Sequence, residues 1–421
     1  MSDRYVCGVD LGTTKVCAAI AERDEDGVQR ILGFGVAPSA GFLHKGMVAN
    51  ISKTAEAISA AVALASNRAG VDVRVINVGV AGEHISSMRH RNYVTIADPD
   101  REISQEDIDR LKADLKTFPI SPDRQILHII PEEFFIDHQG GVQNPVGMAG
   151  SRLEAVNHLV LASIAAIQNI WKSVERAGFE VGEYILQPIA SSVATLDDNE
   201  MDIGTLLIDI GGGTTDIAIL HNHTVRYTEV IGVAGNQVTN DIREALGVVT
   251  EEAEALKKRY GYATERAIVK DEEILIHGVG ARKNSRIPVS LLTQIISLRM
   301  RELFTMIDGK VRKAGLKDKI KAGVVLTGGG SLLRGCADLV EEVLGLPAKI
   351  GVPLESATGS LREIERPEYS TSVGLLTGLP AAKAPEEEQK KSAVFKPRKK
   401  RAKKGMLNQA WTSFKDFFDE L

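Results

Sequence analysis

Cysteine is scarce in this chain of 421 residues, which has only Cys7, Cys17 and Cys336. The number is odd, and none of the three stands in a CxxC pair or at the Cys/His spacing of a zinc site. Neither a disulfide framework nor a zinc finger is therefore predicted. All three lie in apolar runs, so we expect buried, inert thiols in a protein of a reducing compartment.

Long hydrophobic runs are also missing. No stretch reaches the roughly 18 uninterrupted apolar residues of a membrane span, and the N-terminus MSDRYVCGVD lacks the basic and apolar regions of a signal peptide. We therefore expect a chain that is neither secreted nor membrane-spanning. With 43% hydrophobic and 25% charged residues, the composition is that of a globular protein of roughly two to four domains.

Positive charge is concentrated near the C-terminus. Residues 396–404, KPRKKRAKK, hold seven of the 51 Lys and Arg residues, whereas the whole chain has a formal net charge of −5. An acidic body thus carries a basic collar, by which we mean residues 396–404. The body lacks basic patches interleaved with aromatic residues, so we expect no nucleic-acid partner and favour an anionic membrane surface for the collar.

Two similar phrases mark the chain. VCGVDLGTTKVCAAI (6–20) and LLIDIGGGTTDIAI (206–219) each run from an apolar strand through an aspartate, glycine and two threonines into a second apolar run. Each predicts a β-hairpin whose backbone N–H groups and hydroxyls can hold an anion. Two such turns facing each other would clamp a nucleotide. The turn residues are Gly12, Thr13, Thr14, Gly211, Gly212, Gly213, Thr214 and Thr215.

An aspartate ends the first strand of each hairpin. Asp10 and Asp209 would be costly beside a polyphosphate unless a cation lay between them. The pair therefore predicts Mg²⁺, held partly through water.

The segments between the hairpins alternate in type. Residues 53–70 read as a helix in α/β surroundings, and residues 85–163 as an inserted α+β subdomain with a helix opened by a Ser104/Asp107 capping box. Helical spacing over residues 164–177 predicts that Trp171 packs in the core with its isoleucines. Residues 235–261 and 288–315 read as further helices. Gly33-Phe34-Gly35 and Gly278-Val279-Gly280 lack the third glycine of a dinucleotide fingerprint and are predicted to be loops.

Five features follow one another in an order typical of the actin, sugar-kinase and heat-shock-chaperone superfamily. They are the two hairpins, the link LQPIASSVA (186–194), the turn VVLTGGGSLLRG (324–335) and the segment YSTSVGLLTGL (369–379). Within this superfamily DLGTTKV, GVAGEHISSM (79–88), HIIPEEFFID (128–137) and NPVGMAGSRLE (144–154) resemble the FtsA family of bacterial cell-division proteins. The resemblance covers residues 5–380.

The resemblance implies a two-lobed, duplicated, ribonuclease-H-like α/β fold with ATP in the cleft. It assigns residues 1–84, 164–198 and 366–380 to the first lobe and residues 85–163 to the inserted subdomain. Residues 199–235 and 313–365 would form the second lobe, and residues 236–312 its subdomain. Residues 381–404 would be a flexible linker ending in the collar, and residues 405–421 a membrane-binding helix.

The resemblance also implies roles for individual residues. Lys15 would join the hairpins in contacting phosphates, Asp10 and Asp209 would face Mg²⁺, and Gln187 would orient the attacking water. The adenine turn would be Gly329, Gly330 and Ser331, with Glu254, Lys257, Gly235 and Asn236 around the nucleoside. Arg286 and Arg299 fall where the family contacts the acidic C-terminal peptide of FtsZ.

The implied function is an ATP-binding adaptor, at most a slow ATPase, that polymerises on the inner face of the cytoplasmic membrane. It would tether FtsZ filaments at the division site and recruit later division proteins through the inserted subdomain. The alternatives are a pilus-assembly adaptor, a small-molecule kinase and a chaperone-type ATPase. A kinase would need a further carboxylate base, and a chaperone a larger C-terminal domain, neither of which the sequence offers.

The C-terminal segment GMLNQAWTSFKDFFDEL (405–421) has apolar residues at steps of three and four. On a helix they form one stripe, with polar residues opposite. Such a helix would lie in a membrane interface and not cross the bilayer. The stripe comprises Leu407, Ala410, Trp411, Phe414, Phe417, Phe418 and Leu421.

Overall fold

The computed structural model describes residues 4–23, 29–39, 41–96, 102–278, 280, 283–355 and 361–377. The chain divides into two compact units, Met1–Ala382 and Lys383–Leu421, and the following description concerns the first. The linker and collar predicted for residues 381–404 and the helix predicted for residues 405–421 lie outside the described residues.

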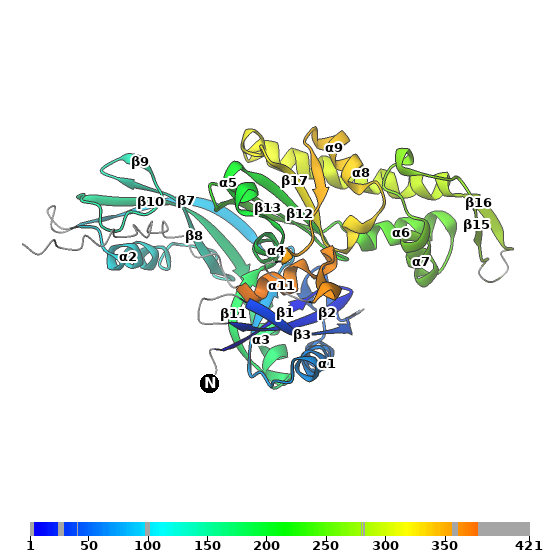
Figure 1. The fold of residues 1–421 in the computed structure, drawn as a ribbon, viewed down its shortest axis with the longest axis horizontal. Helices are drawn as coiled ribbons and strands as arrows, with labels where there is room; N and C mark the ends of the chain where they lie inside the picture. The colour runs from blue at the N-terminus through cyan, green and yellow to red at the C-terminus, as the bar shows by residue number, and fades with distance from the viewer. Residues whose placement is uncertain are drawn as a thin grey trace, which may run out of the picture. The chain divides into compact units, whose positions relative to one another are not determined.

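The first lobe is built on a five-stranded sheet of order β11-β6-β1-β2-β3. Strands β1 (Tyr5–Leu11), β2 (Lys15–Arg23) and β3 (Gln29–Pro38) form an antiparallel meander, and β6 (Val75–Val80) and β11 (Glu180–Leu186) add parallel neighbours. Helices α1 (Ile51–Ala69) and α3 (Ile164–Arg176) cover one face, and α4 (Gln187–Thr195) and α11 (Ser370–Thr377) lie on the other (Figure 1). A short hairpin, β4 (Leu43–His44) and β5 (Met47–Val48), precedes α1. The helices predicted over residues 53–70 and 164–177 are confirmed.

The loop predicted at Gly33-Phe34-Gly35 is wrong, because these residues lie within strand β3. A Cβ at Gly33 would lie 2.2 Å from the carbonyl oxygen of Ala65, and one at Gly35 would lie 2.2 Å from that of Ala61. The glycines therefore let helix α1 approach the strand closely.

The core position predicted for Trp171 is also wrong. Ile167, Ile170 and Val174 of α3 are buried, whereas Trp171 is 46% exposed. It follows Ile170 directly in the sequence, and a step of about 100° per residue carries it to the edge of the buried stripe. Periodicity alone did not separate the edge of the stripe from its centre.

The second lobe repeats the topology of the first. Its sheet has the order β14-β13-β12-β17-β18, with a meander of β12 (Thr205–Ile210), β13 (Thr215–His221) and β14 (Thr224–Ile231). Strands β17 (Gly323–Thr327) and β18 (Ala348–Ile350) add the parallel neighbours. The duplicated two-lobed fold is thus confirmed, and the repeated phrase is the first hairpin of each copy.

The inserted subdomain is a four-stranded antiparallel sheet of order β7-β10-β8-β9. Its strands are β7 (Ser86–Thr95), β8 (Arg124–Ile136), β9 (Gln139–Val142) and β10 (Arg152–Ser163), and α2 (Gln105–Leu115) packs on one face. The predicted capping box is confirmed: the backbone N–H of Ser104 donates to Asp107 Oδ2 at 2.9 Å.

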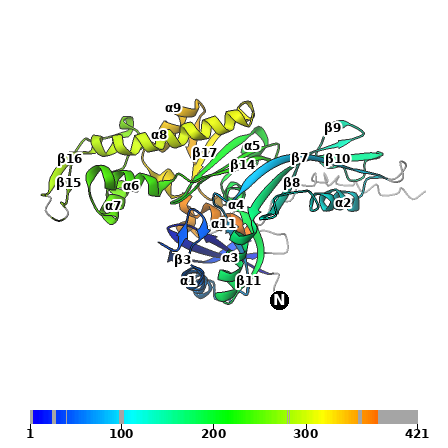
Figure 2. The same cartoon turned by 180° about the vertical axis from the view of Figure 1, so that it is seen from behind.

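A helical subdomain extends the second lobe. It comprises α6 (Gly235–Leu246), α7 (Thr250–Tyr260), the strands β15 (Glu273–Ile276) and β16 (Ser285–Pro288), and the long α8 (Val289–Lys313), which packs along α6 (Figure 2).

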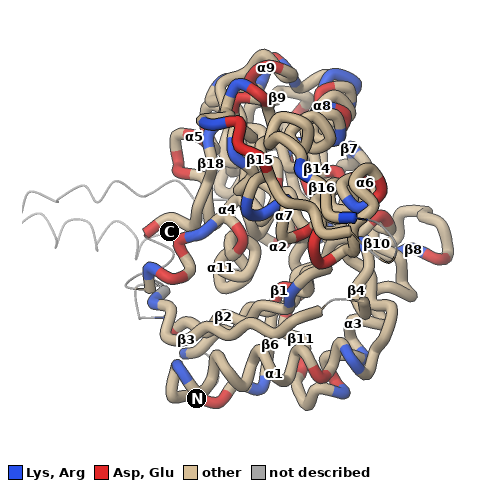
Figure 3. Tube along the Cα trace, turned by 90° about the vertical axis from the view of Figure 1, so that its right-hand side faces the viewer, with Lys and Arg blue, Asp and Glu red and all other residues tan. Residues whose placement is uncertain are grey.

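Charges of both signs lie along α1 and α8 (Figure 3). Further helices among the described residues are α5 (Asp198–Ile203), α9 (Cys336–Leu344) and the 3₁₀ turns η1 (Glu265–Ala267), η2 (Lys317–Lys319), η3 (Gly329–Leu332), η4 (Arg362–Ile364) and η5 (Pro367–Tyr369).

Cys7, Cys17 and Cys336 are buried free thiols, as predicted. Burial raises the pKa of each to about 12, so the reactive thiolate is suppressed. Within the described ranges, no helix combines the length and apolarity needed to cross a membrane.

Candidate functional site

The two glycine-threonine hairpins face each other, as predicted. A Cβ on Gly213 would lie 2.5 Å from Thr13 Oγ1, and one on Gly212 would lie 2.6 Å from Thr14 Cγ2. Side chains at these two positions would collide with the opposite hairpin, so only glycine permits this approach. The backbone N–H of Gly211 donates to Thr214 O at 2.9 Å and closes the second turn.

A pocket of about 580 Å³ lies between the hairpins. Its size and its mixed lining are typical of a small-molecule site. Most of the predicted site residues line it: Asp10, Gly12, Thr13, Thr14, Lys15, Gln187, Asp209, Gly211, Gly212, Gly213, Thr214, Gly235, Asn236, Glu254, Lys257, Gly329 and Gly330.

Two predicted residues turn away from the pocket. Thr215 is fully buried, and its hydroxyl donates to Val233 O at 2.8 Å. The hydroxyl of Ser331 donates to Gly328 O within its own turn, at 2.7 Å. Their side chains hold the walls of the pocket in shape and do not line it. Strand alternation explains Thr215, because successive residues of β13 point to opposite faces.

The carboxylates at the strand ends are buried. Burial, and then repulsion from Asp209, raises the pKa of Asp10 to about 7. Burial likewise raises the pKa of Asp209, against hydrogen bonds from Ser191 and Thr371. Buried carboxylates resist ionisation unless a positive charge compensates them.

A third carboxylate, Asp216, was missed in the sequence. It lines the pocket, and burial followed by repulsion from Asp209 raises its pKa to about 8. Thr214 Oγ1 donates to its Oδ2 at 2.9 Å, while its buried Oδ1 has no hydrogen-bond partner in the part of the chain that the structure describes. The signal was present, since Asp216 directly follows the two threonines of the second phrase.

The donor set fits a hydrated divalent cation. Among the described residues, no group of three or more His, Cys, Asp or Glu side chains is placed to bind a metal ion by itself. The carboxylates of Asp10, Asp209 and Asp216, one of whose oxygens has no partner among the described residues, nevertheless suit an ion that takes its other ligands from water or from a second anion, as Mg²⁺ does.

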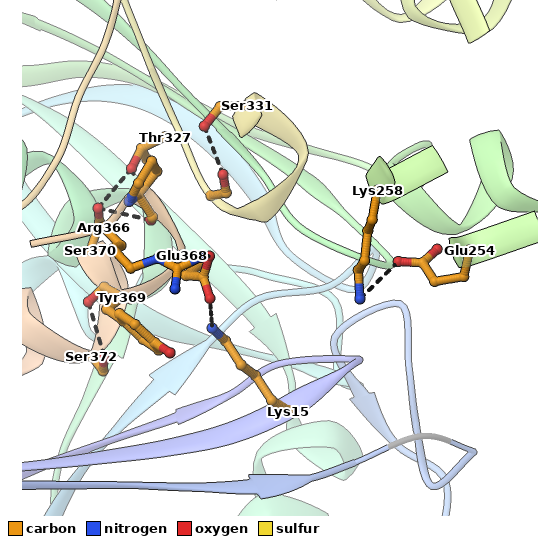
Figure 4. Close-up of polar contacts among 12 residues, drawn as sticks. Lys15, Glu254, Lys258, Thr327, Ser331, Arg366, Glu368, Tyr369, Ser370 and Ser372 are labelled. Atoms are coloured by element: carbon orange, nitrogen blue, oxygen red, sulfur yellow. Dashed lines mark hydrogen bonds and ion pairs between the residues drawn. The ribbon is translucent and has the colours of Figure 1, made fainter. Parts of the chain in front are cut away.

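Lys257 is held by three contacts in the wall of the pocket. Its Nζ lies 3.0 Å from Gly235 O, 2.8 Å from Thr239 Oγ1 and 2.6 Å from Glu254 Oε2. Lys258 pairs with the other oxygen of Glu254 at 3.3 Å (Figure 4). This network joins α6 to α7 and stiffens one side of the pocket.

A segment near residue 370, which no local sequence pattern connects with the hairpins, also lines the pocket. Arg366, Pro367, Glu368 and Thr371 contribute to the wall, and Glu368 Oε1 lies 3.3 Å from Lys15 Nζ (Figure 4). The segment contains η5 and the start of α11, about 350 residues after the first hairpin in the sequence. Only the fold brings the two together.

The two predicted peptide-binding arginines lie in the helical subdomain, on β16 and α8. Arg299 Nε lies 2.6 Å from Asp241 Oδ2, and its NH1 group lies 2.5 Å from Glu302 Oε2. The Arg286 side chain is 70% exposed and lies 3.3 Å from Glu273. Arg286 is thus available for a partner, whereas Arg299 is held by two carboxylates.

A shallow groove of about 470 Å³ lies on the same subdomain. Leu298 is 73% exposed there, and Arg301 pairs with Glu342 at 2.9 Å. Neither Arg286 nor Arg299 lines this groove, whose residues are Thr264, Glu265, Arg266, Gln294, Ser297, Leu298, Arg301 and Glu342.

Comparison with known proteins gives consistent matches. Residues 206–374 match the family model for the cell division protein FtsA, and residues 82–161 match the SHS2 domain inserted in FtsA. The chain is 41% identical to the FtsA of Pseudomonas aeruginosa over 375 residues, which is 89% of each chain. It is 35% identical to that of Escherichia coli over 380 residues, which is 89% of this chain and 90% of the relative.

Solved structures share the fold at low sequence identity. The chain is similar to a protein of the PilM-PilN type IV pilus biogenesis complex, with a TM-score of 0.64, 17% identity, and coverage of 88% of this chain and 97% of the other. It is also similar to MreB5 of Spiroplasma citri bound to ADP, with a TM-score of 0.53, 15% identity, and coverage of 89% and 95%. These two structures therefore share the actin-like architecture at low identity, whereas the two FtsA relatives named above share 41% and 35% of the sequence.

Proposed function

The chain belongs to the FtsA family of cell division proteins, and we propose that it binds Mg²⁺·ATP in the pocket between the hairpins. We also propose that it tethers FtsZ filaments to the membrane. The observation that carries the nucleotide proposal is the apposition of the two hairpins. Their glycine turns present backbone N–H groups beside Lys15, which supplies a positive charge for phosphate.

The nucleotide proposal includes a bound Mg²⁺ ion. Asp10, Asp209 and Asp216 would hold Mg²⁺, mainly through water, together with phosphate oxygens. The bound ion would neutralise the phosphates and lower the pKa of all three carboxylates. The structure of MreB5 bound to ADP supports a nucleotide in this fold, and the buried, uncompensated carboxylates support a cation in this chain.

We expect slow hydrolysis at most. Gln187 begins helix α4, and its amide can orient a water molecule but cannot accept a proton from it. Its Nε2 donates to Asp10 Oδ1 at 2.9 Å, so the amide lies beside the proposed metal site. A bound nucleotide would then act chiefly as a structural ligand between the lobes.

For the partner, we propose that the helical subdomain takes the acidic C-terminal peptide of FtsZ. Arg286 is available for it, and Arg299 would have to exchange an internal carboxylate for one from the peptide. The groove beside Leu298 and Arg301 offers an apolar contact next to positive charge, which suits a partly helical acidic peptide.

For the membrane, we propose that residues 405–421 bind as an amphipathic helix on the cytoplasmic side of the inner membrane at the division site. The collar would add electrostatic attraction, and filament formation would multiply weak single anchors. The inserted subdomain would recruit later division proteins.

The proposal is tested by calorimetric titration of the full-length protein with ATP in Mg²⁺ and in EDTA, and by electron microscopy on anionic lipid. We expect ATP binding that Mg²⁺ strengthens, and filaments on the lipid with ATP. Absence of ATP binding under both conditions would refute the nucleotide proposal. Rapid phosphorylation of a metabolite would instead favour a kinase.

A further inference from the structure

The segment Arg366–Thr371 is fixed to the second lobe by backbone and hydroxyl contacts. Gly328 N donates to Pro367 O at 3.1 Å, and Thr327 Oγ1 lies 3.1 Å from the same carbonyl oxygen and 2.7 Å from Ser370 Oγ. Thr371 donates to Asp209 Oδ2 at 3.2 Å. The segment therefore contacts both the turn after β17 and the end of β12.

One charged side chain of the segment, that of Glu368, contacts the first hairpin. Glu368 lies between two cations: its Oε1 is 3.3 Å from Lys15 Nζ, and its Oε2 is 2.9 Å from Arg366 NH2 (Figure 4). The side chains of Lys15 and Glu368 are 22% and 19% exposed, so water screens this pair less than a surface pair.

The aromatic ring of Tyr369 sets the position of the lysine. Lys15 Nζ lies 3.9 Å from the centroid of that ring, which in turn packs edge-on against Phe34 at 4.9 Å. The ammonium group is thus drawn by both a carboxylate and a π face. In this arrangement a residue of the first hairpin is bound to the segment instead of being free for a ligand.

We propose that Glu368 is an internal competitor of the nucleotide phosphates for Lys15 and so sets both affinity and phosphate discrimination at the pocket. The inference rests on the proposed function. Entry of a polyphosphate places negative charge near Glu368 and offers Lys15 a stronger acceptor. Lys15 then transfers to the phosphate, while Arg366 retains Glu368. The exchange couples phosphate binding to the segment that joins both lobes.

The test compares ATP and ADP affinities in Mg²⁺ for the native protein, Glu368→Gln, Lys15→Met and the double variant. Glu368→Gln removes the competing charge but keeps the shape of the side chain. It should tighten ATP binding by about three- to tenfold, and ADP binding by less, because charge-assisted contacts strengthen with ligand charge. Glu363→Gln is the matched control, because Glu363 belongs to the same stretch of chain but is 72% exposed and does not line the pocket.

The double variant distinguishes competition from simple repulsion. If Glu368 acts through Lys15, the gain from Glu368→Gln should disappear in the Lys15→Met background. Unchanged or weaker ATP binding by Glu368→Gln, or a gain that persists without Lys15, would overturn the inference. If neither the native protein nor any variant binds ATP, the proposed function fails. Melting temperatures of all variants exclude a folding defect as the cause.

Discussion

The side-chain amide of Gln187 donates to Asp10 Oδ1 at 2.9 Å, while Ser191, one helical turn later, donates to Asp209 Oδ2 at 2.6 Å. Helix α4 therefore touches the equivalent aspartates of both lobes. A ligand that changes the charge at either aspartate acts directly on the helix that links the two sheets. This relationship makes Gln187 and Asp209 the first residues to test.

Gln187→Ala should spare ATP binding and slow any hydrolysis. The Gln187 amide makes one hydrogen bond to Asp10 and is not among the turn residues proposed to hold phosphate, so the ATP Kd should change by less than about tenfold. The hydrolysis rate should fall, because the variant has no amide at this position to orient the attacking water. Calorimetry gives the Kd, and phosphate release in single-turnover conditions gives the rate. A hydrolysis rate equal to that of the native protein would remove Gln187 from the mechanism.

Asp209→Ala should abolish the dependence of ATP binding on Mg²⁺. The variant loses a carboxylate that the proposed cation needs, so its Kd values in Mg²⁺ and in EDTA should converge. Asp209→Asn is the matched control for packing, because an amide of the same size can still accept from Ser191 and Thr371. If Asp209→Asn keeps the full Mg²⁺ effect, the metal lies elsewhere.

The buried carboxylates predict an unusual pH dependence. The pKa of Asp216 is about 8 in the folded protein, above its ordinary value of 3.8, so the folded state binds more protons than the unfolded chain. The contribution of Asp216 to the free energy of unfolding of the ligand-free protein should therefore fall as pH rises from about 4, with the loss complete above about pH 8. Half-buried His84 and buried His128 and His158, whose pKa values burial lowers to about 4, change the free energy of unfolding in the opposite direction below about pH 6.5. The net fall is therefore expected between about pH 6.5 and pH 8.

Asp216→Asn tests this dependence. At pH 8 the substitution should stabilise the ligand-free protein by more than about 1 kcal/mol, because it removes an uncompensated buried charge. Denaturant unfolding between pH 7 and pH 8.5 should show a flatter profile for the variant. Asp202→Asn is the control, since the Asp202 side chain is 60% exposed. Equal slopes for the native protein and Asp216→Asn would contradict the assignment.

The sequence predicted those features that depend on residues close together in the chain. The hairpins, the Ser104/Asp107 capping box and the long α8 all follow from residues within one or two turns of each other. Glu368 could not be connected with Lys15 in this way, because no local pattern relates residues that far apart in the chain. Gly33 and Gly35 were misread since close helix packing and a loop favour the same residue.

Charge reversal of an arginine should weaken capture of the FtsZ C-terminal peptide. Because charged hydrogen bonds contribute roughly 1.5 to 3 kcal/mol, Arg286→Glu and Arg299→Glu should each raise the peptide Kd at least about tenfold. Arg299→Glu also repels Asp241 and Glu302, so its melting temperature must be measured alongside. Fluorescence anisotropy measures affinity, with Arg301→Glu testing the groove. Native affinity in both Arg286→Glu and Arg299→Glu would refute this placement, and loss in Arg301→Glu alone would move the site to the groove.

The segment 405–421 should be necessary for membrane binding. Trp411 belongs to the predicted apolar stripe, so Trp411→Glu would place a charge in the acyl region of the interface. Co-sedimentation with anionic vesicles should be lost in this variant and on deletion of residues 405–421, while ATP and peptide binding persist. The matched control is Thr412→Glu, which adds the same charge to the polar face and should retain most of the binding.

The collar should contribute separately from the helix. Each Lys or Arg near an anionic leaflet adds about 1 kcal/mol, so neutralising residues 396–404 should weaken vesicle binding strongly without abolishing the apolar contribution. The remaining vesicle binding should depend less on salt concentration, because ionic strength screens the charges of the collar and does not weaken the apolar contact of the stripe. Adding ATP should strengthen vesicle binding of the native chain if filaments join the anchors.

Should the protein lacking residues 405–421 sediment with vesicles as the intact chain does, the tethering mechanism is refuted, and the apolar stripe must contact protein instead.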